Sequence, residues 1–292
     1  MIVRPDRPRI RSRLYVPGTK TEWIDKAIAA GTDAVIFDLE DAVADVDKER
    51  ARAFVAAAVA RGREHPLIFV RVNETSSPLE LDDLEAVVRP GLFGVVVPKV
   101  TTASEISALD LVLTWLEARS GMEPGSVVVS PILETAAAIY HAYDLAVASP
   151  RVEYTGGIAT RGGDVERAIG YRWSPSGSES EAMRATTLVA LRAAGVCNPM
   201  TGIWTELDDE DGLAGFARQG RDLGYVGMDI IHPSHVGTVN STFAPDEQAL
   251  REARAIVAAA SDGSASRQGG RMVDRAMLRT AEALLRQAPE AL

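Results

Sequence analysis

The 292-residue chain carries 31 basic and 41 acidic residues, a formal net charge of −10, and 46% of its residues are hydrophobic. This balance is typical of a folded globular protein and argues against a disordered chain or a general nucleic-acid binder. Apolar runs are too short for a membrane span, and the basic first residues lack the apolar core of a secretory signal. The single cysteine, Cys197, excludes an internal disulfide, which predicts a cytoplasmic protein. From the charge and the short apolar runs we expect that it binds neither nucleic acid nor membrane.

Short apolar runs typical of buried parallel strands alternate with longer helical segments. Eight strand–helix pairs predict an α/β protein, either a (β/α)8 TIM barrel over residues 1–260 or a doubly wound open sheet, which has the same alternation. The predicted strands are 13–17, 34–39, 67–72, 93–98, 127–133, 152–156, 201–205 and 226–231. The predicted helices are 21–30, 48–61, 79–89, 103–119, 135–148, 179–194, 211–223 and 246–260.

The C-terminal residues 261–292 differ in composition from the rest of the chain. Residues 261–270 (SDGSASRQGG) are rich in Gly and Ser, which predicts a flexible hinge, and a last helix is expected over 272–287. A helix after a complete barrel must cap an end as a lid or contact a neighbouring subunit. A frayed terminal helix is the alternative.

Charged side chains follow several of the predicted strands. They include Asp38, Glu40 and Asp41, then Arg71, Lys99, Glu134 and Asp164. In a TIM barrel these strand ends share one mouth, where the active site lies. Carboxylates without a set of His and Cys residues favour a hard cation such as Mg²⁺. The chain has no HExxH, paired CxxC or GxSxG motif, which weighs against a zinc peptidase or a serine hydrolase.

Six short motifs occur in order along the chain: RSRLYVPG, DLED, RVN, PK, ILET and IHP. Together they resemble the citrate lyase beta-subunit-like branch of the HpcH/HpaI aldolase superfamily, over residues 11–285. The resemblance implies a TIM barrel, a homotrimer or hexamer, and a substrate that is an acyl-CoA or acyl-carrier thioester.

The resemblance also implies roles for individual residues. Glu134 and Asp164 are expected to bind Mg²⁺, with Glu134 also close to substrate, and Arg71 to hold a substrate carboxylate or carbonyl. GGRMVDRAMLRTA resembles the segment of malyl-CoA and citramalyl-CoA lyases that carries a catalytic aspartate to a neighbouring subunit, here Asp274. Basic residues expected near the CoA phosphates are Arg11, Lys20 and Lys26.

The activity that the resemblance implies is Mg²⁺-dependent carbon–carbon cleavage. A 3-hydroxyacyl-CoA of the malyl-CoA or citramalyl-CoA type would yield a 2-oxo acid and an acyl-CoA, with Asp274 as acid and base. Three alternatives stay open at this point. They are a thioesterase with the same site, a non-catalytic barrel subunit, and a pyruvate-type aldolase that works without CoA.

Overall fold

The computed structural model describes residues 4–62, 65–156, 159–174, 176–259, 266–268, 271–273 and 275–287. By internal contacts the chain divides into two compact units, Met1–Phe243 and Ala244–Leu292. Among the residues just given, no helix is both long enough and apolar enough to cross a membrane.

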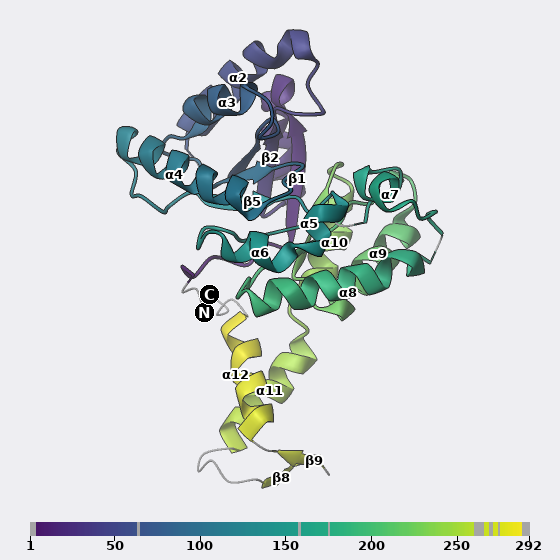
Figure 1. Cartoon of the computed structure of the whole chain (residues 1–292). Coiled ribbons are helices and arrows are strands. Elements are labelled where there is room, and N and C mark those ends of the chain that lie inside the picture. Colours follow the sequence, from purple (N-terminus) through teal and green to yellow (C-terminus); the bar gives the residue numbers. More distant parts are fainter. Residues whose placement is uncertain are drawn as a thin grey trace. The chain divides into compact units, whose positions relative to one another are not determined.

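The first unit is built on a parallel sheet whose strands alternate with helices along the chain (Figure 1). The strand order is β5-β4-β3-β2-β1-β7-β6, and every neighbouring pair is parallel. Most of these strands are fully buried runs of Val, Ile and Phe, as expected where both faces of a parallel sheet are covered. The predicted α/β class is therefore confirmed. The strands are β1 (Ser12–Pro17), β2 (Ala34–Asp38), β3 (Leu67–Arg71), β4 (Gly94–Val97), β5 (Val128–Pro131), β6 (Met200–Thr201) and β7 (Gly227–Ile230).

Side-chain contacts show that the sheet is curled. Arg13 of β1 donates from Nη1 to Ser130 Oγ of β5 at 2.9 Å, although β2, β3 and β4 separate these strands in the sheet. A flat sheet with strands about 4.8 Å apart would hold the two side chains far from each other. The inward-facing side chains therefore enclose a common interior.

The segment expected to be the sixth strand, residues 152–156, is not a strand. Isolated bridges join it to Val129 in β5 and to Ile132 just after β5, and the amide of Met200 in β6 donates to the Thr155 carbonyl at 2.8 Å. Tyr154, in the middle, has a φ of 52°, a left-handed conformation that interrupts an extended chain. The sheet in the described residues thus has seven strands rather than the eight expected, and both of its edges contact this segment.

The helices of the first unit largely follow the sequence pattern. The predicted helix 135–148 is divided at His141. Among the described residues, α7 and α10 are helices that the sequence pattern did not predict, and α10 follows β7. Two short 3-10 helices, η1 (Gly18–Trp23) and η2 (Asp45–Asp47), follow β1 and β2. The other helices are α1 (Ile24–Ala30), α2 (Lys48–Ala60), α3 (Leu79–Val87), α4 (Ala103–Arg119), α5 (Ala136–Tyr140), α6 (Ala142–Val147), α7 (Asp164–Ile169), α8 (Ser178–Ala193), α9 (Glu210–Leu223) and α10 (His235–Phe243).

Two hydrophobic clusters form the core of this unit. The larger combines one face of the strands with the buried faces of the helices, and Figure 1 shows α2, α3 and α4 along the outside of the sheet. The smaller contains Ile36, Phe69, Val96 and Met200 from four strands, and Tyr154 from the segment between the sheet edges. Its residues come from strands far apart in the sheet, so it fills the interior of the curl below the carboxyl ends of the strands.

The second unit contains two helices and a short hairpin. α11 (Glu247–Ala259), expected to be part of the barrel, belongs instead to this unit. The unit also contains α12 (Arg275–Gln287) and the antiparallel pair β8 (Ser266–Gln268) and β9 (Arg271–Val273). The expected terminal helix is present but begins at Arg275. Most of the expected hinge, residues 261–265 and 269–270, lies outside the described residues, and the lid stays a prediction.

Candidate functional site

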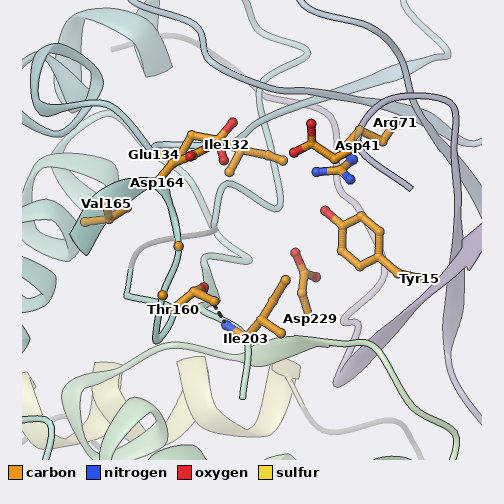
Figure 2. Close-up of a pocket in the computed structure, with 12 residues that line it drawn as sticks. Tyr15, Asp41, Arg71, Ile132, Glu134, Thr160, Asp164, Val165, Ile203 and Asp229 are labelled. Carbon is orange, nitrogen blue, oxygen red and sulfur yellow. Dashed lines mark hydrogen bonds between the residues drawn. The ribbon is translucent and has the colours of Figure 1, made fainter. Parts of the chain in front are cut away.

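A cavity of about 260 Å³ lies at the carboxyl ends of the strands in the first unit. Figure 2 shows polar side chains on two sides of the cavity, with Glu134 and Asp164 on one and Arg71 and Tyr15 on the other. Asp229 and Ile203 line the lower part of the view. The full lining consists of Tyr15, Asp41, Arg71, Ile132, Glu134, Thr160, Gly162, Gly163, Asp164, Val165, Ile203 and Asp229.

Arg71, at the end of β3, is held rigidly by the DLED segment that follows β2. Its Nε and Nη2 donate to the two Asp38 carboxylate oxygens at 2.7 and 2.5 Å, and Nη1 lies 3.0 Å from Glu40 Oε2. Burial lowers the pKa of the guanidinium, but the hydrogen bonds and charge of Asp38 raise it more, so the net direction is upward. Arg71 is therefore a permanent, oriented cation at the cavity wall.

The DLED segment itself is stabilised by a buried ammonium and by its own carboxylate. Lys48 Nζ donates to the carbonyls of Leu39 and Glu40 at 2.8 and 2.7 Å. Asp38 accepts from the amides of Glu40 and Ala42 at 2.9 and 3.0 Å. These hydrogen bonds fix the conformation of the DLED segment. Asp38 and Glu40 can therefore hold Arg71, at the end of the neighbouring strand β3, in one orientation.

Glu134 follows β5 and accepts a hydrogen bond from the main-chain amide of Lys99 at 2.8 Å. Lys99 has a φ of 53°, a left-handed conformation that is unusual for a residue with a side chain. Its ammonium lies 2.5 Å from Glu40 Oε1 and 3.6 Å from Asp41 Oδ1. Lys99 therefore links the carboxylates of two strand ends, one through its backbone and one through its side chain.

The carboxyl group of Glu134 is strained electrostatically. Burial, followed by the negative charges of Asp164 and Glu40, raises its pKa to about 7, against the opposing effect of the Lys99 amide. Asp164 begins α7 and is contacted by Arg167, one helical turn later, which is mostly exposed. Two neighbouring carboxylates with so little compensating charge form a place where an added cation is stabilised.

The residues present fit a divalent cation of the hard, oxygen-preferring kind. Glu134 and Asp164 supply carboxylate oxygens from two different loops, and no group of three or more His, Cys, Asp or Glu suited to a metal occurs in the described part of the chain. Mg²⁺ commonly uses one or two protein carboxylates and completes its octahedron with water and substrate oxygens. A bound cation would also relieve the repulsion that raises the pKa of Glu134.

The floor of the cavity is a buried ion pair. Arg13 of β1 donates to both carboxylate oxygens of Asp229 in β7 at 2.6 and 2.8 Å, and both side chains are at most 2% exposed. The guanidinium also stacks 5.2 Å from the centre of the Phe69 ring. Such a saturated bidentate pair fixes the shape of the floor and leaves little freedom for Asp229 to move.

The structure brings Arg71, Glu134 and Asp164, three of the predicted site residues, to one cavity, but it does not bring Arg11 there. Arg11 precedes β1 and pairs with Asp33, which precedes β2, at 2.6 Å. This pair stands at the amino ends of the strands, opposite the cavity, and the expected position of Arg11 near the CoA phosphates stays a prediction. A residue before a strand and a residue after it lie at opposite ends of that strand, and in a parallel sheet all carboxyl ends lie on the same side.

The other predicted residues have different positions. Lys20, in η1, and Lys26, in α1, are exposed near the carboxyl end of β1, and Lys26 Nζ lies 4.8 Å from the centre of the Trp23 ring. Gly18 permits the turn into η1, because a Cβ there would lie 2.6 Å from the Asp38 carbonyl. Asp274 lies outside the described residues, so its role stays a prediction.

Tyr15 and Asp229 are polar lining residues that were not singled out from the sequence. Both lie within strands rather than after them. The available signal was a charge inside each of two otherwise apolar strands, Arg13 in the first and Asp229 in the last. Opposite charges in buried strands predict a pair, and the pair marks the inward face of β1 on which Tyr15 also lies, two residues after Arg13.

The comparison with known families agrees with this arrangement. The model of the HpcH/HpaI aldolase/citrate lyase family matches residues 11–233. The chain belongs to this family. The match spans every strand of the sheet and all the cavity residues, so the family resemblance expected from the sequence motifs is confirmed.

Relatives within the HpcH/HpaI family are similar over nearly their whole length. The citrate lyase subunit beta of Haemophilus influenzae is 33% identical over 290 residues, which cover 95% of this chain and 96% of the relative. The L-malyl-CoA/beta-methylmalyl-CoA lyase of Cereibacter sphaeroides is 31% identical over 313 residues, covering 97% and 96%. A crystal structure of CitE from Mycobacterium tuberculosis, in complex with magnesium, acetoacetate and coenzyme A, has a TM-score of 0.72 and 27% identity, covering 96% of this chain and 98% of that one.

Proposed function

We propose that this chain is a Mg²⁺-dependent carbon–carbon lyase that cleaves a 3-hydroxyacyl-CoA to a 2-oxo acid and an acyl-CoA. The observation that carries the proposal is the placement of Glu134 and Asp164 in one cavity with Arg71. Support also comes from the relatives, which are named as lyases, and from the magnesium and coenzyme A in the CitE complex.

The cofactor assigned to the site is Mg²⁺, with Glu134 and Asp164 as its protein ligands. Bound there, it would supply positive charge to the carboxylate and oxygen of the part of the substrate that becomes the 2-oxo acid. Manganese has similar preferences for oxygen ligands and is the obvious substitute in an assay.

Arg71 acts as a fixed electrostatic group. Its contacts with Asp38 and Glu40 hold the guanidinium in place before substrate arrives, so no reorganisation is needed as negative charge develops on a substrate oxygen. In sites of this kind one such donor contributes about 3–4 kcal/mol to transition-state stabilisation.

Asp274 is proposed as the acid and base of the reaction. In cleavage the hydroxyl loses its proton to water, the bond from the hydroxyl-bearing carbon to the thioester α-carbon breaks, and protonated Asp274 delivers its proton to that α-carbon. In condensation the same carboxylate removes the proton. Residues 261–292 are proposed to act as a lid carrying Asp274 to the barrel mouth of a neighbouring subunit in a homotrimer or hexamer.

We further propose that the first unit closes as a (β/α)8 barrel, with residues 152–156 in place of a regular strand. The hydrogen bond from Met200 to Thr155 and the bridges to β5 and to the residue that follows it support this arrangement. Lys20 and Lys26, exposed beside the mouth, are proposed to contact the CoA phosphates.

The deciding experiment is a panel of malyl-, methylmalyl-, citramalyl- and citryl-CoA, incubated with the enzyme with and without EDTA. We expect release of a 2-oxo acid and an acyl-CoA from one of these thioesters, and its loss when the metal is removed. Free CoA without acyl-CoA would instead indicate thioester hydrolysis.

The variant Asp274→Asn serves as an internal comparison in the same assay. It is expected to lose most turnover while its melting temperature and Mg²⁺ binding stay those of the wild type. Full turnover by this variant would contradict the proposed acid and base.

A further inference from the structure

Tyr15 occupies a position in the cavity that neither the metal site nor the Arg71 contacts account for. It lies on β1, two residues after the buried Arg13, and its ring faces the interior of the curl. Figure 2 shows its hydroxyl directed into the cavity, on the side away from Glu134 and Asp164. Within the described residues no hydrogen bond to this hydroxyl is formed by another side chain or by the backbone.

The ring of Tyr15 is fixed by Arg71. The guanidinium carbon lies 5.1 Å from the ring centre, within cation–π range. Arg71 is itself locked by Asp38 and Glu40, so Tyr15 stacks on a rigid support. Because the ring is already fixed, binding a ligand restricts only the rotation of the hydroxyl group and costs little conformational entropy. The hydroxyl is therefore a preorganised hydrogen-bond donor.

The two side chains together offer unused donors to the same space. A guanidinium has five N–H groups. Those of Arg71 on Nε and one on Nη2 donate to Asp38, and Nη1 lies 3.0 Å from Glu40 Oε2. At least one N–H on each Nη therefore has no hydrogen-bond partner in the described part of the chain. Because the phenol is neutral near pH 7, it can donate without adding to the charge of the site.

The anions around Tyr15 determine what it can bind. Asp229 lies below it and Asp41 above it in Figure 2, but Asp229 is already saturated by Arg13, and Asp41 faces the Lys99 ammonium. The free donors of Arg71 and Tyr15 therefore suit an anionic oxygen that enters with the ligand.

We infer that Tyr15 is a substrate-binding residue whose hydroxyl donates a hydrogen bond to the carboxylate or oxo oxygen of the 2-oxo acid that Arg71 also faces. The inference rests on the proposed function for the identity of the ligand, a small 2-oxo acid held with Mg²⁺. It adds a neutral donor to a site otherwise built from charges, and a neutral donor favours a ligand oxygen by geometry rather than by net charge.

The test measures binding of oxaloacetate and of pyruvate by calorimetry in the presence of Mg²⁺, and so does not depend on turnover. Tyr15→Phe keeps the ring and its stacking on Arg71 and removes only the hydroxyl. We expect its Kd for the better-bound 2-oxo acid to rise about 10- to 100-fold, the loss typical of a hydrogen bond to a charged group. The matched control is Tyr140→Phe on α5, where the side chain is 85% exposed, and it should bind like the wild type.

A measurement of Mg²⁺ binding without 2-oxo acid separates a local from a structural effect. Tyr15→Phe should bind Mg²⁺ as the wild type does and melt at the same temperature. Equal 2-oxo acid affinity in wild type and Tyr15→Phe overturns the role of Tyr15 and leaves the proposed function standing. Weaker binding accompanied by lost Mg²⁺ binding also overturns it, since the hydroxyl would then be structural. If the wild type binds neither 2-oxo acid with Mg²⁺, the proposed function fails first.

Discussion

Glu117 and Glu134 are two buried glutamates in the same unit with opposite electrostatic surroundings. Glu117, on α4, is fully buried and accepts two hydrogen bonds from Arg151 at 2.7 Å, together with the amides of Gly125 and Val127. Burial raises the pKa of Glu117, but the Arg151 and backbone hydrogen bonds lower it more, so the net direction is downward. Glu134 has one backbone donor and acidic neighbours, and its pKa rises to about 7.

The difference separates a structural ion pair from a binding site. Around Glu117 the protein itself supplies the compensating charge, and nothing further is required. Around Glu134 the compensation is incomplete, and the missing positive charge is what a divalent cation provides. Burial of an acid alone does not distinguish the two cases, whereas the number and charge of its partners does.

The largest expected effect comes from Glu134→Gln. The amide can still accept from the Lys99 backbone but cannot bind a cation as a carboxylate does. We expect Mg²⁺ affinity to fall steeply and lyase turnover to drop about 10³-fold, equivalent to the several kcal/mol that a metal supplies. Calorimetry and the thioester assay give both readouts.

The control for Glu134→Gln is Asp144→Asn, which removes an exposed acid on α6. Asp144→Asn should change neither the Mg²⁺ affinity nor the lyase turnover. If Glu134→Gln kept the metal affinity of the wild type, the contrast between the two glutamates would lose its functional meaning.

Arg151→Met tests the other side of the comparison. The Arg151 guanidinium also pairs with Asp110 of α4, and its loss leaves Glu117 buried and unpaired. Breaking one partner of such a pair costs about 3–5 kcal/mol. We expect urea denaturation to show a loss of that size, with Mg²⁺ binding by the folded protein unchanged.

A double variant, Arg151→Met with Glu117→Leu, removes both charges and should recover much of the lost stability, because no buried ion is left unpaired. If Arg151→Met alone were as stable as the wild type, the ion pair between Arg151 and Glu117 would not contribute to stability.

The smallest of these effects is a pH dependence at Glu80, on α3, a buried acid outside the cavity. Burial, then the charges of Asp83 and Glu105, raise its pKa to about 7 from a usual 4.5. The protonated form favours the folded state, so this contribution is present below pH 4.5 and is lost as pH rises towards 7. Glu80→Gln should therefore stabilise the protein by about 2 kcal/mol at pH 8 and leave it unchanged near pH 4, as measured by denaturation at the two pH values.

Glu80 also sharpens the comparison, because burial is the main cause of its raised pKa, as for Glu134, but Glu80 does not line the cavity. Glu80→Gln should therefore leave Mg²⁺ binding unchanged. Weaker Mg²⁺ binding by this variant would contradict the distinction between a raised pKa at the cavity and a raised pKa outside it.

Much of the fold follows from local sequence. β2, β3, β4 and β5 lie where continuous runs of Val, Ile and Phe predict them, because strands buried on both faces need no polar alternation. Residues 152–156 (VEYTG) contain the strand-favouring Val, Tyr and Thr but do not form a strand, since Tyr154 takes a left-handed conformation that no residue preference predicts. α10 was missed because its first turns, HVGTVN, are rich in β-branched residues and Gly, which disfavour helices in isolation.

The site divides in a similar way. Arg71, Glu134 and Asp164 could be anticipated, because residues after parallel strands meet at one edge and the family motifs include them. Arg11 precedes its strand, so strand direction places it at the amino ends of the strands, and its expected position near the CoA phosphates stays a prediction. Tyr15 was not singled out, although the buried charge of Arg13, two residues earlier in β1, marks the inward face of that strand.

The left-handed backbone of Lys99 has a consequence for how this site can vary among related sequences. Since the main-chain amide, and not the ammonium, anchors Glu134, the anchoring survives any replacement at position 99 that tolerates a φ of 53°. Glycine or asparagine meets that condition, whereas valine or isoleucine does not. Position 99 can thus change its charge without displacing the glutamate, and only the shape of its chain is constrained.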